Sequence, residues 1–169
     1  MESSRPHRVL CVDDDEDACE MLSVLLKHSN IDASCVKSAG QAWELMRAHN
    51  FDLYLLDTWL PGLDGFELCR QIRAVDQYTP ILFYSAAAYD KDKRKGLEAG
   101  ANAYLTKPHV DVLLRTIMNL VHRPVKALAA GNAEWRRDAS SGQFTFSHED
   151  RPSRFAPSLG TQISDSERA

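Results

Sequence analysis

The feature that most constrains the fold of this chain is a regular alternation of two kinds of segment over residues 9–121. Short apolar runs, rich in β-branched and aromatic residues, predict strands that are covered on both faces. The segments between them carry apolar residues at helical spacing, which predicts amphipathic helices. The predicted strands lie at 9–12, 31–36, 53–56, 80–84 and 103–105, and the predicted helices include 18–26, 39–49, 66–72, 90–100 and 113–121.

Five strands that alternate with five helices predict an α/β fold with a parallel sheet and helices on both faces. For five such units we expect a doubly wound five-stranded parallel sheet of the flavodoxin-like (βα)5 type, with strand order 2-1-3-4-5. Ligands of such sheets bind beyond the carboxyl ends of the strands, where the strand order reverses. Here that point lies between the first and third strands.

The alternating pattern stops near Arg123-Pro124, so we expect one domain over residues 1–124. Residues 125–169 shift to Ser, Gly, Pro, Arg and acidic residues, and we expect a mostly flexible tail with no recognisable output domain. Within it, Gln143–Ser147 alternates like a strand, and Ala133–Asp138 is interpreted as a possible helical turn. The tail carries no helix-turn-helix pattern.

Composition excludes several classes of function. The net charge of −4 gives no support to direct binding of nucleic acid or of a membrane surface. No segment approaches the ~20 apolar residues of a membrane span, and the apolar run before the first acids is too short for a signal peptide, so we expect a cytoplasmic protein. The four cysteines form no CxxC pair and are interpreted as reduced core thiols, and the six histidines form no zinc pattern.

Polar residues stand at the carboxyl ends of four predicted strands. Asp13 and Asp14 follow the first strand, Asp57 the third and Ser85 the fourth, and Lys107 comes soon after the fifth. These ends meet at one edge of a parallel sheet, so three carboxylates are brought close together and repel one another. A hard divalent cation removes that repulsion, and oxygen ligands suit Mg²⁺. The sequence therefore predicts a magnesium site, with Lys107 supplying a positive charge beside it.

The acidic run "DDDED" at residues 13–17 is interpreted as two neighbouring sites. Asp13 and Asp14 close the first strand and belong to the metal pocket. Asp15, Glu16 and Asp17 fall at the start of the next helix, where the helix dipole favours negative charge.

This arrangement resembles the receiver domain of bacterial two-component response regulators, of the single-domain type. The matching positions are Asp13-Asp14 after "VLCV", Asp57 after "DLYLL", the following "LPGLDG", Ser85 after "ILFY", and Lys107-Pro108 in "AYLTKP". The resemblance covers roughly residues 7–123, and no part of residues 125–169 takes part in it.

The resemblance implies a phosphorylation-dependent switch. Asp57 would be the phosphoacceptor and would attack a phosphohistidine on a histidine kinase. Mg²⁺ would be held by Asp14, Asp57 and the backbone carbonyl of Trp59, with Asp13 reaching it largely through water. The domain would be no enzyme for other substrates, since it would catalyse only its own aspartyl phosphorylation and dephosphorylation.

The same resemblance implies how the switch works. Lys107 and Ser85 would each bind a phosphoryl oxygen, and Tyr104 would turn inward into the space that Ser85 leaves. A downstream protein would then read the face formed by the fourth helix, fifth strand and fifth helix. A cis Lys107-Pro108 peptide bond is also implied.

Two further positions are expected to tune the chemistry. Trp59 stands two residues after Asp57, and Ala87 two residues after Ser85. We hypothesise that Trp59 shields the acyl phosphate from water and lengthens its lifetime. The charged run at 91–95, "KDKRK", is interpreted mainly as a solvated helix face.

Several alternatives share part of this pattern. The chain is also compatible with a phosphorelay intermediate that passes the phosphoryl group to a histidine phosphotransfer protein, or with the receiver fragment of a longer regulator. A flavin-binding flavodoxin is disfavoured by five acids where a phosphate loop is needed. A haloacid-dehalogenase phosphatase is disfavoured because Trp59 occupies the position of its second Asp.

Overall fold

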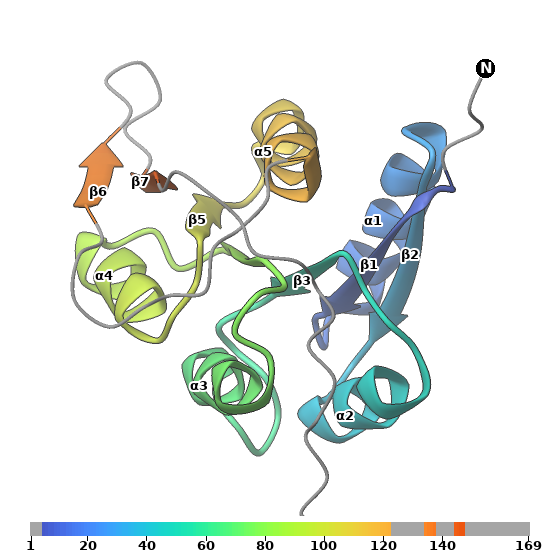
Figure 1. Ribbon diagram of the computed structural model, residues 1–169, viewed down its shortest axis with the longest axis horizontal. Coiled ribbons are helices and arrows are strands. Elements are labelled where there is room, and N and C mark those ends of the chain that lie inside the picture. Colours follow the sequence, from blue (N-terminus) through green and yellow to red (C-terminus); the bar gives the residue numbers. More distant parts are fainter. Residues whose placement is uncertain (1–4, 123–133, 138–143, 148–169) are drawn as a thin grey trace, which may run out of the picture.

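The computed structural model describes residues 5–122, 134–137 and 144–147. Five parallel strands pair in the predicted order, β2-β1-β3-β4-β5 (Figure 1). Their bounds are β1 (His7–Val12), β2 (Ile31–Val36), β3 (Leu53–Leu56), β4 (Ile81–Ser85) and β5 (Ala103–Thr106). The flavodoxin-like architecture expected from the sequence is therefore confirmed.

The five helices pack on both faces of the sheet, with α1 and α5 on one side and α2, α3 and α4 on the other (Figure 1). Their bounds are α1 (Glu16–His28), α2 (Ala39–Ala48), α3 (Gly65–Val75), α4 (Asp90–Glu98) and α5 (Val110–His122). None of the helices in the described part of the chain is both long and apolar enough to span a membrane.

Alternation along the strands divides the core into two layers. In β1, Val9 and Cys11 point to the layer shared with α1 and α5, and Leu10 and Val12 point to the layer beneath α2 and α3. All four of these side chains are at most 1% exposed. The strands read as continuous apolar runs because both faces are covered.

The start of α3 is predicted one residue too late. The sequence predicts a helix at 66–72, but α3 begins at Gly65. Asp64 is the N-cap, since its side chain accepts a hydrogen bond of 2.6 Å from the backbone N–H of Glu67. Such a cap satisfies one of the free N–H groups of a helix start.

Two more strands extend the sheet beyond β5. β7 (Phe144–Ser147) pairs antiparallel with β5, with Ala103 opposite Thr145, and β6 (Glu134–Arg137) pairs antiparallel with β7 (Figure 1). The strand expected at 143–147 is confirmed, and the helical turn at 133–138 is wrong. Pairing with a neighbouring strand overrides the weak local preference of a four-residue segment. The rest of the tail, expected to be flexible, lies outside the described residues.

Candidate functional site

Three carboxylates meet at the carboxyl edge of the sheet. Asp13 and Asp14 leave β1, and Asp57 leaves β3 beside it. One oxygen from each lies within 4.8 Å of the others. Two backbone hydrogen bonds continue the strand pairing to this point, from Asp13 N–H to the Val36 carbonyl (3.0 Å) and from Asp57 N–H to the Val12 carbonyl (2.9 Å). The predicted convergence of the acids is thus present on rigid strand ends.

The acidic run divides as the sequence predicts. Asp13 is buried, and its carboxylate accepts a hydrogen bond from Asp15 N–H (3.1 Å). Asp15 in turn is the N-cap of α1 and accepts from the N–H groups of Asp17 and Ala18. Asp14 is exposed and directs an oxygen toward the other two acids. One short segment therefore serves both the pocket and a helix start.

Asp57 is held in an unusual environment. The residue is only 8% exposed, and among the described residues its Oδ1 has no hydrogen-bond partner. Burial raises the pKa of Asp57, and the nearby Ser85 hydroxyl and the charge of Lys107 oppose that effect only in part. A buried carboxylate oxygen without a partner is costly, and a cation beside it relieves that cost.

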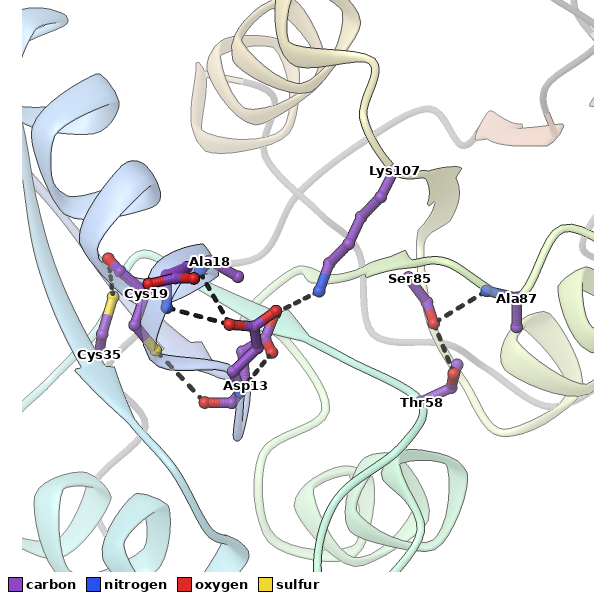
Figure 2. A network of polar contacts seen from close by, with 10 residues as sticks. Asp13, Ala18, Cys19, Cys35, Thr58, Ser85, Ala87 and Lys107 are labelled. Atoms are coloured by element: carbon purple, nitrogen blue, oxygen red, sulfur yellow. Dashed lines mark hydrogen bonds and ion pairs between the residues drawn. The ribbon is translucent and has the colours of Figure 1, made fainter.

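Lys107 supplies the positive charge predicted for this edge. Its Nζ forms an ion pair with Asp13 (Figure 2). The same atom lies 5.9 Å from the ring centre of Tyr84. Burial lowers the pKa of Lys107, but the hydrogen bond with Asp13 and the charge of Asp57 outweigh it, so the pKa is raised. Lys107 is therefore a fixed ammonium group at the rim of the acidic pocket.

The donor set fits Mg²⁺. The three clustered carboxylate oxygens are hard ligands of the kind this ion prefers, and the Asp57 carboxylate also has a buried oxygen without a partner among the described residues. One lysine cannot balance three carboxylates, so a negative charge remains at the pocket. Trp59 stands two residues after Asp57 and is 75% exposed.

Thr58 is a site residue that the sequence reasoning missed. Its hydroxyl is hydrogen-bonded to the hydroxyl of Ser85 over 2.6 Å, and both residues are buried (Figure 2). The available signal was its position directly after Asp57, at a strand end that points into the pocket. Ser85 also accepts a hydrogen bond of 3.3 Å from the backbone N–H of Ala87.

Tyr104 lies inward in this structure. It is 1% exposed, and its hydroxyl donates a hydrogen bond of 2.8 Å to the carbonyl of Ala87. Its ring packs against Phe83, with 5.6 Å between ring centres. A Cβ on Gly96 of α4 would come within 2.8 Å of that ring, so α4 packs closely over Tyr104. The backbone of Ala87 therefore links Ser85 to the aromatic residue on β5.

Two backbone features fix the loops around the pocket. Gly65 N–H donates to the Thr58 carbonyl (3.0 Å), and a Cβ on Gly65 would lie 2.0 Å from the carbonyl oxygen of Asp57. At the ends of β4 and β5, Lys107 N–H donates to the Ser85 carbonyl (2.9 Å). The Lys107-Pro108 peptide bond is cis, as the resemblance implies.

Residues 9–119 match the family model of the response regulator receiver domain. The chain belongs to this family. Its members are the receiver domains of two-component response regulators, whose general function is a phosphorylation-dependent switch.

Curated relatives support the same assignment. The DNA-binding response regulator MtrA of Mycolicibacterium smegmatis is 40% identical over 101 residues, which are 60% of this chain and 44% of that protein. The alkaline phosphatase synthesis transcriptional regulatory protein PhoP of Bacillus subtilis is 33% identical over 136 residues, 80% of this chain and 56% of that protein. The chain spans about half the length of these relatives.

Solved receiver structures share the fold. A putative response regulator from Chloroflexus aurantiacus matches with a TM-score of 0.66 and 34% identity, covering 70% of this chain and 99% of that one. The BeF3-activated N-terminal receiver domain of Klebsiella pneumoniae RstA matches with a TM-score of 0.66 and 29% identity, covering 69% and 100%.

Proposed function

We propose that this receiver accepts a phosphoryl group from the phosphohistidine of a histidine kinase onto Asp57, in a reaction that needs Mg²⁺. The observation that carries the proposal is the buried Asp57 carboxylate, which lies in one cluster with Asp13 and Asp14 and whose Oδ1 has no partner among the described residues. A free oxygen in a fixed, dry position is the nucleophile that such a transfer requires.

In the proposed transfer, an Asp57 oxygen forms a bond to phosphorus while the phosphorus–nitrogen bond to the histidine breaks. Bound Mg²⁺ would neutralise charge on the transferring group. Asp14, Asp57 and the Trp59 carbonyl would hold the ion, with Asp13 acting largely through water. Lys107, already fixed by Asp13, would donate to one phosphoryl oxygen.

The switch we propose runs from Ser85 through Ala87 to Tyr104. The Ser85 hydroxyl would exchange its hydrogen bond with Thr58 for one to a phosphoryl oxygen. Because Ala87 N–H bonds Ser85 and the Ala87 carbonyl bonds Tyr104, that exchange would act on the aromatic residue of β5. Phosphorylation of Asp57 would thereby change the packing of α4 on β5.

The partner surface in this proposal is the face formed by α4, β5 and α5. β7 already pairs with β5 at this edge, with Thr145 opposite Ala103, so a protein that docks along β5 would meet β7 first. We propose signalling through protein contacts, in the cytoplasm where the kinase domain supplies phosphohistidine. MtrA is named a DNA-binding regulator, but this chain spans only 44% of that protein.

The test is phosphotransfer from a purified, autophosphorylated histidine kinase domain, with and without Mg²⁺. We expect label on the chain with Mg²⁺ and little without it, and loss of label in Asp14→Asn, which removes one proposed ligand. Glu20→Gln changes an exposed acid on α1 outside the pocket and is the matched control. Equal labelling with and without Mg²⁺ would contradict the proposal. Return of label to a purified histidine phosphotransfer protein would identify a phosphorelay intermediate.

A further inference from the structure

Three of the four cysteines gather beside the acidic pocket. Cys11 on β1 and Cys35 on β2 are direct neighbours in the parallel register, and both point to the core layer beneath α1. Cys19 lies on α1, and its carbonyl is in contact with the Cys35 thiol (Figure 2). The fourth, Cys69, is buried in the opposite layer, where its thiol donates to the Ala99 carbonyl. The fold therefore places three thiols together and one apart.

Cys35 is the most accessible thiol of the group. It is partly exposed on β2, an edge strand, whereas Cys11 is 0% and Cys19 is 8% exposed. Its Sγ lies 3.4 Å from the Ser23 hydroxyl and 3.5 Å from the Cys19 carbonyl oxygen. The Cys11 thiol beside it lowers the pKa of the Cys35 thiol against the opposing effect of burial. Thiolate character and exposure are what make a thiol reactive.

The cluster is joined to the pocket through the backbone of Asp13. The Cys19 thiol donates a hydrogen bond of 3.3 Å to the Asp13 carbonyl (Figure 2). The Asp13 N–H bonds the carbonyl of Val36, the residue after Cys35. The backbone of Asp13 is thus held on both sides by segments that carry the cysteines.

We propose that Cys35 is a peroxide-sensitive thiol that forms a disulfide with Cys11, and that this bond weakens cation binding at the acidic pocket. The effect on signalling rests on the proposed function, whereas the thiol chemistry does not.

The chemistry balances with a peroxide as oxidant. The Cys35 sulfur attacks one oxygen of hydrogen peroxide, the O–O bond breaks, and a sulfenic acid forms with release of hydroxide. The Cys11 sulfur then attacks the Cys35 sulfur and displaces the hydroxyl group. The two thiol hydrogens leave in water, so two thiols and one peroxide give one disulfide and two waters, and a thiol reductant reverses the reaction.

The coupling follows from strand geometry. Neighbouring strands lie about 4.8 Å apart, whereas the Cα atoms of a disulfide are most often about 5.5–6 Å apart. Bond formation between the paired Cys11 and Cys35 therefore shifts β1 and β2 relative to each other, one residue before Val36 and two residues before Asp13. A displacement of Asp13 disturbs both its carboxylate and the lysine that it holds.

The experiment uses the full chain, first reduced and then treated with hydrogen peroxide. We expect peptide mapping without reductant to find a Cys11–Cys35 disulfide. Calorimetric titration with Mg²⁺ is expected to give at least about tenfold weaker binding, the size typical of disturbing groups around a metal site. Reduction is expected to restore the affinity. Cys35→Ser and Cys35→Ala should both be insensitive to peroxide, while Cys69→Ser should behave as wild type.

Different outcomes of this experiment contradict different parts of the proposal. A missing Cys11–Cys35 link in wild-type protein overturns the proposal without reference to any variant. A link that forms and leaves the Mg²⁺ affinity unchanged overturns the coupling alone. If the reduced protein binds no Mg²⁺, the proposed function and the coupling both fail, and peptide mapping still decides the thiol chemistry.

Discussion

The hydroxyl groups of Thr58 and Ser85 are hydrogen-bonded to each other over 2.6 Å, directly beside the Asp57 carboxylate. In this arrangement Ser85 has a partner that it must leave in order to bind a phosphoryl oxygen. Thr58 therefore competes with the ligand for Ser85. The pair sets the free-energy difference between the resting and the engaged position of Ser85.

Thr58→Val and Ser85→Ala are expected to change binding of the phosphoryl analogue beryllofluoride in opposite directions. Removal of the competing hydroxyl in Thr58→Val should tighten binding, and removal of the donor in Ser85→Ala should weaken it. A net hydrogen bond is worth about 1 kcal/mol, so each change should be roughly fivefold. Titration in the presence of Mg²⁺ measures both. Changes of the same sign would mean that Thr58 does not compete with the ligand.

Gly65→Ala should destabilise the domain strongly. The new Cβ would lie 2.0 Å from the Asp57 carbonyl oxygen, and backbone at both sites would have to move. We expect a loss of about 3 kcal/mol in the free energy of unfolding, at the upper end for overpacking. Gly40→Ala is the matched control, because a Cβ there meets only the Ser38 hydroxyl at 4.0 Å. Similar urea midpoints for the two variants would contradict this.

Asp57→Asn should unfold at a higher temperature than wild type at neutral pH without Mg²⁺. Burial raises the pKa of Asp57, so the folded state binds the proton more tightly than the unfolded chain does. The contribution of Asp57 to stability therefore falls as pH rises from the ordinary carboxyl value through the raised native one, and it stays low above that. The difference in unfolding temperature between Asp57→Asn and wild type should therefore become smaller at acidic pH.

The effect of Mg²⁺ on the stability of wild type and of Asp57→Asn provides a complementary measurement. Saturating Mg²⁺ should stabilise wild type, by about 2.7 kcal/mol at a hundredfold excess over the dissociation constant, and leave Asp57→Asn nearly unchanged. Thermal unfolding with and without the ion decides this. Equal stabilisation of both proteins would place the cation away from Asp57.

Much of this site was predictable because it is built from strand ends. The period of the apolar pattern locates β1, β3, β4 and β5, and in a parallel sheet their carboxyl ends meet at one edge. Asp13, Asp57 and Ser85 then fall together without further information. The capping role of Asp15 likewise follows from local rules that the sequence carries.

Other features depend on contacts between distant segments. The hydrogen bond between Thr58 and Ser85 joins the loop after β3 to the last residue of β4, and nothing in "LLDTWL" states where the Thr58 hydroxyl points. The clustering of Cys11 with Cys35 depends on the register between β1 and β2, which spacing alone does not give. The strand at Glu134–Arg137 was mistaken for a helical turn because its pairing with β7 decides its conformation.

Trp59→Asn should speed the spontaneous loss of the phosphoryl group from Asp57. The Trp59 side chain is 75% exposed and follows Asp57 by two residues, where it can cover the acyl phosphate from the solvent side. Exclusion of the attacking water lengthens the lifetime about tenfold if it adds roughly 1.4 kcal/mol to the barrier of hydrolysis. The decay of phosphorylated protein, followed by intact mass, measures the rate. An unchanged or slower decay would contradict the shielding role.

The most direct test of the central claim is the mass of the intact chain after incubation with Mg²⁺ and a small-molecule phosphodonor such as acetyl phosphate. The account predicts that wild type gains one phosphoryl group, and that Asp57→Asn gains none while it still folds. Peptide mapping after reductive trapping should place the group on Asp57. A wild-type chain that gains no mass, or an undiminished gain in Asp57→Asn, would contradict the account.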